Sequence, residues 1–342
     1  METAVPIIDI EPLRCGSVEQ RQRVGNLIGD ACRTSGFFYV VGHGISSDEF
    51  DQLDELSRQF FALTIAQKMA IRMELGGRAW RGYFPVGDEL TKGLPDQKEG
   101  IYFGAELPSD HPKVVTATPL HGSNLFPAPE SFSAALEFRQ AVLNYLETMT
   151  SLGHLLMEGV ALSLQLEASY FDRYTADPLV LFRIFHYPPL PSTAASLESE
   201  DSELQGQWSV GEHTDYGLLT ILRQDETGGL QIKSQSQWIE AAPIAGSLIC
   251  NIGDMLDRMT GGLFRSTPHR VKNRSNRGRL SFPFFFDPNF DAEIKPIRDE
   301  IEDDALARWD GESVHQFEGN YGDYVMNKVS RVFPDLGREQ LP

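Results

Sequence analysis

The segment His213-Thr214-Asp215, separated from His269 by 53 residues, places the strongest constraint on how this chain can fold. Residues two apart on an extended strand point to the same face, so the His213 imidazole and the Asp215 carboxylate lie side by side. For His269 to join them, a strand distant in the sequence must lie beside the first. The pattern therefore predicts a β-sheet protein in which these three side chains meet in one interior space.

Two neutral imidazole nitrogens and one carboxylate oxygen form a ligand set that suits Fe(II) and leaves coordination positions open. We therefore predict that His213, Asp215 and His269 are metal ligands and the catalytic centre. A His-x-Asp pair alone often arises by chance, and the other six histidines are more typical of core, loop or surface positions. The surrounding sequence favours the metal site, because strand-like runs occupy residues 218–222, 230–232, 247–252 and 266–271.

A second motif, Arg279-Leu280-Ser281, begins ten residues beyond His269. Its guanidinium and hydroxyl share one face of a predicted strand, and an arginine fork is the natural partner of a carboxylate. The same alternation directs Pro283 and Phe285 inward, where they are predicted to line an apolar substrate pocket. It directs the other members of the strand outward against covering helices: Leu280, Phe282, Phe284 and Phe286. The alternatives without a functional role are that Arg279 forms an ion pair with an acidic residue of the core and that Phe285 is an ordinary core residue.

These motifs resemble the 2-oxoglutarate- and Fe(II)-dependent dioxygenase superfamily, in the branch similar to isopenicillin N synthase and to plant and microbial metabolic oxygenases. The resemblance rests on four core motifs: His213-Thr-Asp215-Tyr-Gly, Asn251-Ile-Gly-Asp254, Ser266-Thr-Pro-His269-Arg-Val and Arg279-Leu-Ser281. Two N-terminal segments are also similar to such chains, Val5-Pro-Ile-Ile-Asp-Ile10 and the stretch from Ser35 to Gly44. The resemblance therefore covers nearly the whole chain.

The resemblance implies a mostly β fold with flanking helices, built on a double-stranded β-helix (jelly-roll) core. We expect one oxygenase domain over 1–342, with a mixed, helical N-terminal portion at 1–175, the catalytic core at about 178–290 and a C-terminal segment at about 291–342. Apolar residues at helical spacing between 131 and 166 predict a long buttressing helix, with an interruption near Gly153. The Gly- and Pro-rich stretch 76–129 predicts irregular covering structure.

The resemblance also implies the chemistry. It predicts Fe(II) at the triad, 2-oxoglutarate as cosubstrate, dioxygen, and ascorbate as an optional reductant. Arg279, Ser281 and Tyr187 are implied to hold the cosubstrate, while Arg81 and Tyr83 are implied at the mouth of the substrate pocket. Many members carry Asn two places before the tyrosine, where this chain has Phe185. The expected reaction is hydroxylation, demethylation or desaturation at a C–H bond of a small molecule of secondary metabolism, with release of succinate and CO2.

Three alternatives stay open at this point. The first is an Fe(II) oxidase of the same fold that does not use 2-oxoglutarate, since an Arg-x-Ser pair can also hold a substrate or another small anion. The second is a non-catalytic binding or sensor protein. The third is a zinc hydrolase with the same ligands, although Arg279 has no obvious task in such an enzyme.

Charge and cysteine content limit the partners. A net charge of −19 argues against nucleic acid and against an acidic membrane surface, because both need clustered Lys and Arg. Three cysteines without Cys-x-x-Cys spacing suggest neither a disulfide framework nor a zinc knuckle. The first residues lack signal-peptide character, and no apolar run reaches the ~20 residues of a membrane span. We expect a cytoplasmic protein that acts on a small molecule, with no obligate protein partner evident.

Overall fold

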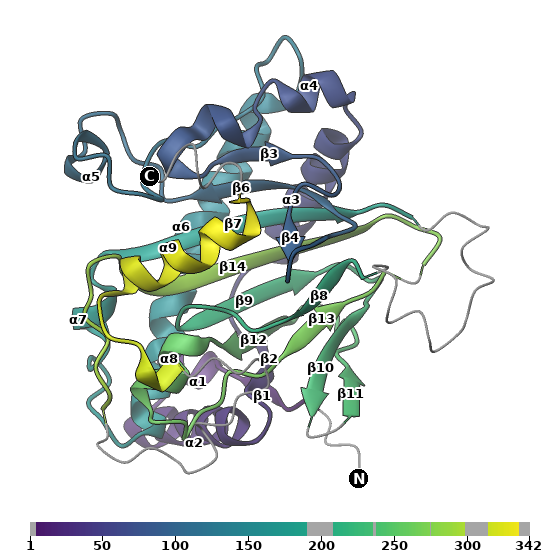
Figure 1. Cartoon of the computed structure of the whole chain (residues 1–342). Helices are drawn as coiled ribbons and strands as arrows, with labels where there is room; N and C mark the ends of the chain where they lie inside the picture. The colour runs from purple at the N-terminus through teal and green to yellow at the C-terminus, as the bar shows by residue number, and fades with distance from the viewer. Residues whose placement is uncertain (1–4, 190–207, 235–236, 274, 298–313, 335–342) are drawn as a thin grey trace.

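Two β-sheets with helices packed around them make up the protein (Figure 1). The computed structural model describes residues 5–189, 208–234, 237–273, 275–297 and 314–334. The larger sheet has eight strands in the order β1-β2-β12-β9-β14-β7-β6-β3, and the smaller has four in the order β11-β10-β13-β8. Residues of both sheets line one cavity between them. This is the arrangement of a double-stranded β-helix, as the family resemblance implies.

The strands of the larger sheet are β1 (Ile7–Asp9), β2 (Phe37–Val41), β3 (Gly82–Phe84), β6 (Glu99–Gly104), β7 (Pro178–Tyr187), β9 (Leu219–Gln224), β12 (Leu248–Ile252) and β14 (Arg279–Asn289). The strands of the smaller sheet are β8 (Val210–His213), β10 (Leu230–Ser234), β11 (Gln237–Glu240) and β13 (His269–Val271). A two-stranded sheet consists of β4 (Leu90–Thr91) and β5 (Leu94–Pro95). Only the β1–β2 pair is parallel among the strand pairings described.

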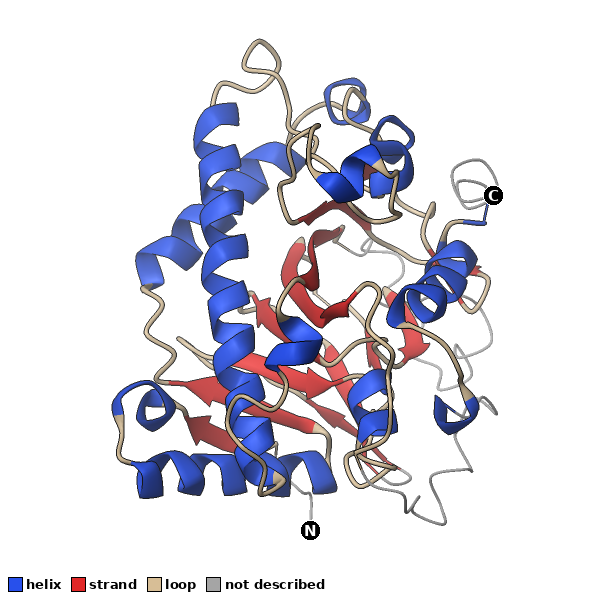
Figure 2. Ribbon diagram, turned by 90° about the vertical axis from the view of Figure 1, so that its left-hand side faces the viewer, coloured by secondary structure: helices blue, strands red, loops and turns tan. Residues whose placement is uncertain are grey.

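The helices are α1 (Glu11–Cys15), α2 (Val18–Thr34), α3 (Ser47–Phe61), α4 (Ile65–Met69), α5 (Pro112–Val115), α6 (Ala135–Ser163), α7 (Asp172–Thr175), α8 (Asp254–Met259) and α9 (Tyr321–Val332), with short 3-10 turns at Met73–Ala79 and Val314–Gln316. Helix α6 is the predicted buttress, and it runs without interruption along the sheet (Figure 2). Gly153 on α6 permits its close approach, because a Cβ there would lie 2.4 Å from the ring of Phe286 on β14. The expected break near Gly153 is therefore corrected to a packing contact.

Strand β14 follows the predicted alternation. Arg279, Ser281, Pro283 and Phe285 line the central cavity. Leu280, Phe282, Phe284 and Phe286 are fully buried and do not line it. The outward face packs on the helical layer, where Phe286 meets the His154 ring of α6 at 4.9 Å between centroids. The register of this strand therefore divides its residues between the cavity and the helical layer.

The region 76–129 differs from the expected irregular cover. Its strands β3 and β6 extend the larger sheet, with β6 paired along the whole of its length to β7. All six residues of β6 are buried, although the segment starts with a charged residue, Glu99. This charge obscures the alternation that would predict a strand. It is satisfied by hydrogen bonds to the Glu99 carboxylate from three side chains, those of Lys68, Tyr83 and His186. The N-terminal portion thus builds part of the sheet itself.

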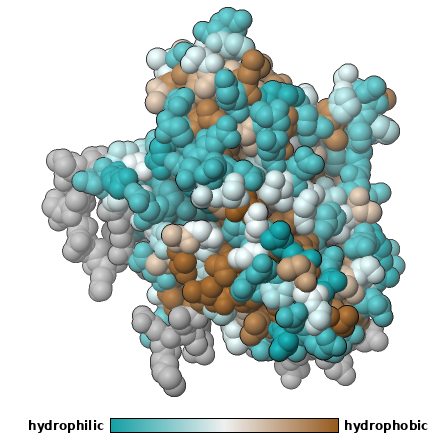
Figure 3. All heavy atoms as spheres, turned by 180° about the vertical axis from the view of Figure 1, so that it is seen from behind, coloured by the Kyte–Doolittle hydropathy of each residue, from teal (hydrophilic) through white to brown (hydrophobic). Residues whose placement is uncertain are grey.

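Hydrophilic side chains cover much of the face opposite to that of Figure 1, with apolar areas between them (Figure 3). Within the described ranges, no helix combines the length and apolar character needed to cross a bilayer. Helix α6 is long enough, but it carries Glu137, Arg139, Glu147 and Glu158. In the predicted C-terminal segment, residues 298–313 and 335–342 lie outside the described part of the chain.

The two faces of β14 give a stability prediction. Phe284 is fully buried and pairs across the sheet with Phe182 and Ile221, whereas Phe285 is partly buried and faces the cavity. Phe284→Ala should lower the free energy of unfolding by about 3–5 kcal/mol, because it leaves a hole in the core. Phe285→Ala should lower it much less. Denaturant unfolding of both variants checks this, and a larger loss for Phe285→Ala would show that the register is wrong.

Candidate active site

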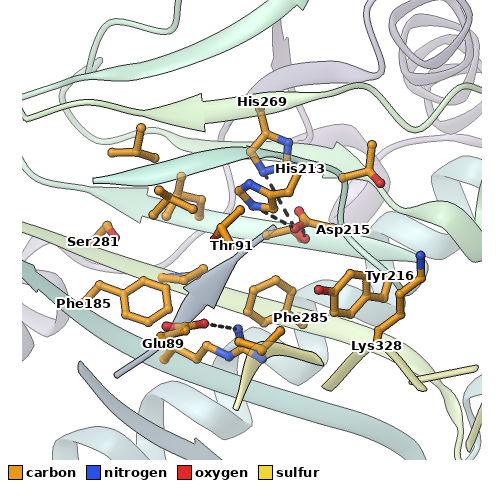
Figure 4. Close-up of a pocket in the computed structure, with 18 of the residues that line it drawn as sticks. Glu89, Thr91, Phe185, His213, Asp215, Tyr216, His269, Ser281, Phe285 and Lys328 are labelled. Atoms are coloured by element: carbon orange, nitrogen blue, oxygen red, sulfur yellow. Dashed lines mark hydrogen bonds and ion pairs between the residues drawn. The ribbon is translucent and has the colours of Figure 1, made fainter. Parts of the chain in front are cut away.

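A cavity of about 820 Å³ lies between the two sheets, and the residues predicted to carry chemistry converge on it (Figure 4). His213 ends β8 and His269 begins β13, and the two residues pair directly across these strands. Asp215 follows β8 two residues later. One ligand atom from each of the three lies within 4.8 Å of the other two. The fold therefore brings the three predicted donors together.

Backbone contacts set the orientation of both imidazoles. The Nδ1 of His213 is 2.8 Å from the carbonyl of Gly211, and the Nδ1 of His269 is 3.2 Å from the carbonyl of Thr267. A carbonyl only accepts hydrogen bonds, so each Nδ1 carries the proton and each Nε2 keeps a free lone pair. Both Nε2 atoms face Asp215 Oδ1, at 3.8 Å from His213 and 3.7 Å from His269.

Asp215 is fixed from the opposite side. Its Oδ2 accepts hydrogen bonds from the Thr220 hydroxyl at 2.6 Å and from the Asn251 amide at 2.7 Å. Thr220 belongs to β9 and Asn251 to β12, so the larger sheet holds a carboxylate that extends from the smaller one. Oδ1 is left to face the two histidines. This outer layer of hydrogen bonds is typical of metal sites, where it orients the ligands.

Electrostatics favour the metal-binding protonation states of His213 and Asp215. Burial and the neighbouring His269 lower the pKa of His213 to about 4, which leaves its imidazole neutral at pH 7. Burial alone would raise the pKa of Asp215, but the two histidines and the hydrogen bonds from Asn251 and Thr220 outweigh it and lower that pKa. The neutral nitrogen of His213 therefore faces an anionic oxygen of Asp215.

Arg279, Ser281 and Tyr187 form a second group in the same cavity. Arg279 is fully buried with its guanidinium 4.7 Å from the centroid of the Tyr187 ring, and its Nε donates to the carbonyl of Gly228 at 2.5 Å. Its Nη1 has no hydrogen-bond partner within the described residues. The Ser281 hydroxyl donates to the Tyr187 hydroxyl at 3.3 Å. A buried guanidinium nitrogen without a partner is costly, so the group suits a carboxylate ligand.

Pro283 and Phe285 line the cavity, but Arg81 and Tyr83 do not. The Arg81 guanidinium is buried under the loop at Leu120, to whose carbonyl it donates at 2.9 Å. The Tyr83 hydroxyl donates to Glu99 on the far side of the sheet from the triad. The expected position of Arg81 and Tyr83 at the pocket mouth is therefore wrong. Both side chains are core residues that support β3 and β6.

Similarity to known proteins agrees with this geometry. Residues 178–288 match the family described as the 2OG-Fe(II) oxygenase superfamily, and residues 5–129 match the N-terminal domain described as non-haem dioxygenase in morphine synthesis. A probable iron/ascorbate oxidoreductase of Dictyostelium discoideum is 53% identical, over 98% of this chain and 97% of its own length. The chain belongs to the 2-oxoglutarate–Fe(II) oxygenase superfamily. It is an oxidoreductase that uses Fe(II) and 2-oxoglutarate to oxidise a small molecule.

Two further relatives show the range of this oxygenase family. A 1-aminocyclopropane-1-carboxylate oxidase of Dictyostelium mucoroides is 38% identical, over 97% of this chain and 95% of its own length. A full-length protein of Neurospora crassa, solved in complex with alpha-KG and thymine, superposes with a TM-score of 0.79 at 27% identity and 98% coverage of both chains. Both are similar to this oxygenase over nearly all of its length.

Sequence reasoning missed two parts of the cavity wall. One consists of charged residues from β7 and from the β4–β6 region, Arg183, Glu89 and Lys98. An arginine within the apolar run of β7 was a usable signal for this group. The other part is helix α9, which contributes Val325, Lys328, Val329, Arg331 and Val332. The amphipathic pattern of α9 shows that a helix has a buried face, but it does not show which surface that face covers.

Two phenol–carboxylate hydrogen bonds hold α9 of the oxygenase against the core. Tyr321 donates to Asp287 at 2.5 Å, and Tyr324 donates to Asp254 at 2.7 Å. Asp287 lines the cavity and is almost fully buried, and its Oδ1 has no hydrogen-bond partner in the described part of the chain. Burial raises the pKa of Asp287 to about 7 despite the hydrogen bond from Tyr321. This carboxyl therefore holds its proton in the folded state at mildly acidic pH.

Asp287 gives a pH prediction. The folded protein keeps this proton up to about pH 7, whereas the unfolded chain releases it near 3.8, so the stabilising contribution is complete below the unfolded pKa and is lost as pH rises to 7. From roughly pH 5 to pH 7 the free energy of unfolding should fall by about 2 kcal/mol more in the wild type than in Asp287→Asn. Denaturant titrations of both proteins at several pH values measure this, and parallel curves would contradict the assignment.

Proposed function

We propose that His213, Asp215 and His269 hold the Fe(II) of this oxygenase, and that Arg279 with Ser281 and Tyr187 holds 2-oxoglutarate. The convergence of two oriented histidine nitrogens and one carboxylate oxygen within 4.8 Å is the observation that carries the proposal. The residues fit the metal. Asp215 Oδ1 lies 3.8 and 3.7 Å from the Nε2 atoms of His213 and His269, so the three residues would offer one Fe(II) ion an anionic oxygen and two imidazole nitrogens.

When bound at the triad, Fe(II) would supply dioxygen activation coupled to oxidative decarboxylation of 2-oxoglutarate, and so the oxidation of a substrate C–H bond. The residues of the chain would bind and orient the reactants. Arg279, whose Nη1 has no hydrogen-bond partner within the described residues, would receive the distal carboxylate of the cosubstrate, and Ser281 and Tyr187 would offer it hydroxyl groups. The stacking of the guanidinium on the Tyr187 ring holds the fork in one plane for two parallel hydrogen bonds.

The apolar part of the cavity is suited to hold the substrate. Phe285 and Pro283 lie on the same face of β14 as Arg279, and α9 covers the space with Val325 and Val329. Apolar walls exclude water from the reacting bond and orient it toward the metal. Phe185 takes the position where many family members have Asn and also lines the cavity, so the cosubstrate is held here without a side-chain amide at that place.

A second candidate is an Fe(II) oxidase reaction that draws its electrons from the substrate or from ascorbate. Two relatives support this candidate. The chain is 38% identical to a 1-aminocyclopropane-1-carboxylate oxidase and 53% identical to a probable iron/ascorbate oxidoreductase. The two reactions differ in stoichiometry. Succinate released in a one-to-one ratio with oxidised substrate supports the 2-oxoglutarate reaction, and product without succinate supports the oxidase.

We propose further that the chain acts as one domain, since β1, β2, β3 and β6 of the N-terminal portion complete the sheet that carries the site. The net charge of −19 supports a role away from nucleic acid and acidic membrane surfaces. On these grounds we propose that the protein acts on a small molecule in the cytoplasm, without an obligate protein partner.

The metal assignment gives a direct test. Asp215→Ala removes the one anionic donor but no apolar contact, so it should abolish Fe(II) binding and succinate release while the fold is kept. Calorimetric titration of metal-free protein with Fe(II) under anaerobic conditions measures binding, and circular dichroism monitors the fold. A variant that binds Fe(II) as the wild type does would disprove the assigned ligand set.

The cosubstrate assignment gives a second test. Arg279→Lys keeps the charge but loses the planar fork, so it should raise the apparent KM for 2-oxoglutarate about ten- to a hundredfold, as expected for roughly 1.5–3 kcal/mol of charge-assisted hydrogen bonding. Arg277→Lys is the matched control, because Arg277 is exposed and pairs with the equally exposed Glu226. An unchanged KM for 2-oxoglutarate in Arg279→Lys would show that Arg279 does not hold the cosubstrate.

A further inference from the structure

Arg183 is a cationic side chain in the cavity wall that the iron and cosubstrate groups leave unused. It lies in the middle of β7, between apolar neighbours, and its side chain is only 15% exposed. Its guanidinium stacks on two rings, 4.1 Å from the centroid of Tyr102 and 4.8 Å from that of Phe285. Stacking on these rings fixes the orientation of the guanidinium plane, and the group lines the cavity.

The hydrogen-bond donors of Arg183 are unmatched. Among the described residues it makes no hydrogen bond, and its one ion pair is a long contact of 3.7 Å to Glu89 Oε1. Glu89 is already engaged, because Oε1 accepts from the Tyr102 hydroxyl at 2.6 Å and Oε2 lies 3.0 Å from Lys98 Nζ. A nearly buried guanidinium with five donors and no close acceptor is incomplete without a ligand.

The position of Arg183 mirrors that of Arg279. Both residues lie on the cavity side of neighbouring strands, and both leave guanidinium nitrogens without partners in the described chain. In the β7–β14 register Arg279 pairs with Tyr187, so Arg183 lies four residues further along the strand, roughly 13 Å away at about 3.3 Å per residue. The cavity wall thus carries two separate guanidinium groups on this strand pair, Arg279 at the start of β14 and Arg183 near the middle of β7.

The charges around the cavity support an anionic ligand. Within the described residues six lysine and arginine side chains line it, against four carboxylates, although the whole chain carries a net charge of −19. One of the four carboxylates, Asp215, faces the proposed iron. A second, Asp287, has its pKa raised to about 7 by burial. A cationic cavity in an acidic protein attracts small anions and concentrates them at the site.

We propose that Arg183 receives a carboxylate of the substrate, and that this oxygenase therefore acts on a small organic acid. The proposal rests on the proposed function, since the triad must supply the oxidation. Phe285 connects the two sites: it stacks under Arg183 and pairs in register with Thr220, which donates to Asp215. Figure 4 shows Phe285 and Glu89 on the side of the cavity that faces the three donors. An acid anchored at Arg183 therefore lays its carbon skeleton over Phe285, toward the proposed iron.

The experiment compares acids with their uncharged amides. Protein saturated with Fe(II) and 2-oxoglutarate is titrated anaerobically by calorimetry with butyrate, phenylacetate and 1-aminocyclopropane-1-carboxylate, and with the three primary amides. At least one acid should bind about tenfold or more tightly than its amide, because the amide cannot form the charged, bidentate contact. The same acid should stimulate succinate release in air.

Variants distinguish a loss of acid recognition at Arg183 from a loss of folding. Arg183→Gln should abolish the preference for acid over amide, and Arg183→Lys should retain part of it, because it keeps the charge without the fork. Arg223→Gln is the matched control. Arg223 lies on β9 of the same sheet, is 13% exposed, and pairs with Asp54 away from the cavity. The control should keep the preference, and melting temperatures show whether each variant folds.

Any of three results would overturn the proposal. The acids bind the wild-type protein no better than their amides, no acid of the panel binds at all, or the Arg183→Gln variant keeps the preference for acid over amide. The wild-type comparison alone decides the matter if Arg183→Gln fails to fold. A separate titration with 2-oxoglutarate distinguishes the two levels of inference. Absent 2-oxoglutarate binding contradicts the proposed function, whereas normal 2-oxoglutarate binding without acid preference contradicts only the role of Arg183.

Discussion

The rest of the site depends on Asp215, whose two carboxylate oxygens contact residues of different sheets. Its Oδ2 is tied to Thr220 and Asn251 of the larger sheet, and its Oδ1 faces the two histidines of the smaller sheet. A carboxylate buried without such partners would take up a proton and lose its value as a donor. The two hydrogen bonds therefore do two things at once. Together with the two histidines they favour the anionic carboxylate, and they fix its position between the two sheets.

The same larger sheet carries the two guanidinium groups for which ligands are proposed. Strand β7 presents Arg183 and strand β14 presents Arg279 to the cavity, and each guanidinium stacks on an aromatic ring. Between them lie Pro283 and Phe285. Because successive inward residues of a strand are about 7 Å apart, the pairing of β7 with β14 sets the spacing between the two guanidinium groups.

Strand faces and the long helix were predictable from short-range patterns, whereas the jelly-roll fold was implied by the resemblance of whole motifs to a known superfamily. His213 and Asp215 share a strand face, Arg279 to Phe286 alternate between two faces, and the apolar spacing of α6 marks a helix that the structure confirms. The missed parts depend on contacts between distant residues. Strand β6 begins with Glu99, whose charge is satisfied only by Lys68, Tyr83 and His186 from elsewhere in the chain. Arg81 and Tyr83 were misplaced because a motif shows neighbours in sequence, not the direction of a side chain.

The two histidines are oriented by main-chain atoms, whereas Asp215 is oriented by side chains. Each imidazole proton is directed to a carbonyl two residues earlier on its own chain, that of Gly211 or Thr267. A main-chain oxygen is present whatever side chain occupies the position, so substitutions there leave this control of the tautomer in place. The Asp215 carboxylate has no main-chain partner of this kind among the contacts described, because its hydrogen bonds come from the Thr220 hydroxyl and the Asn251 amide. The orientation of the two histidines is therefore independent of the side chains at positions 211 and 267, whereas that of Asp215 requires the side chains of Thr220 and Asn251.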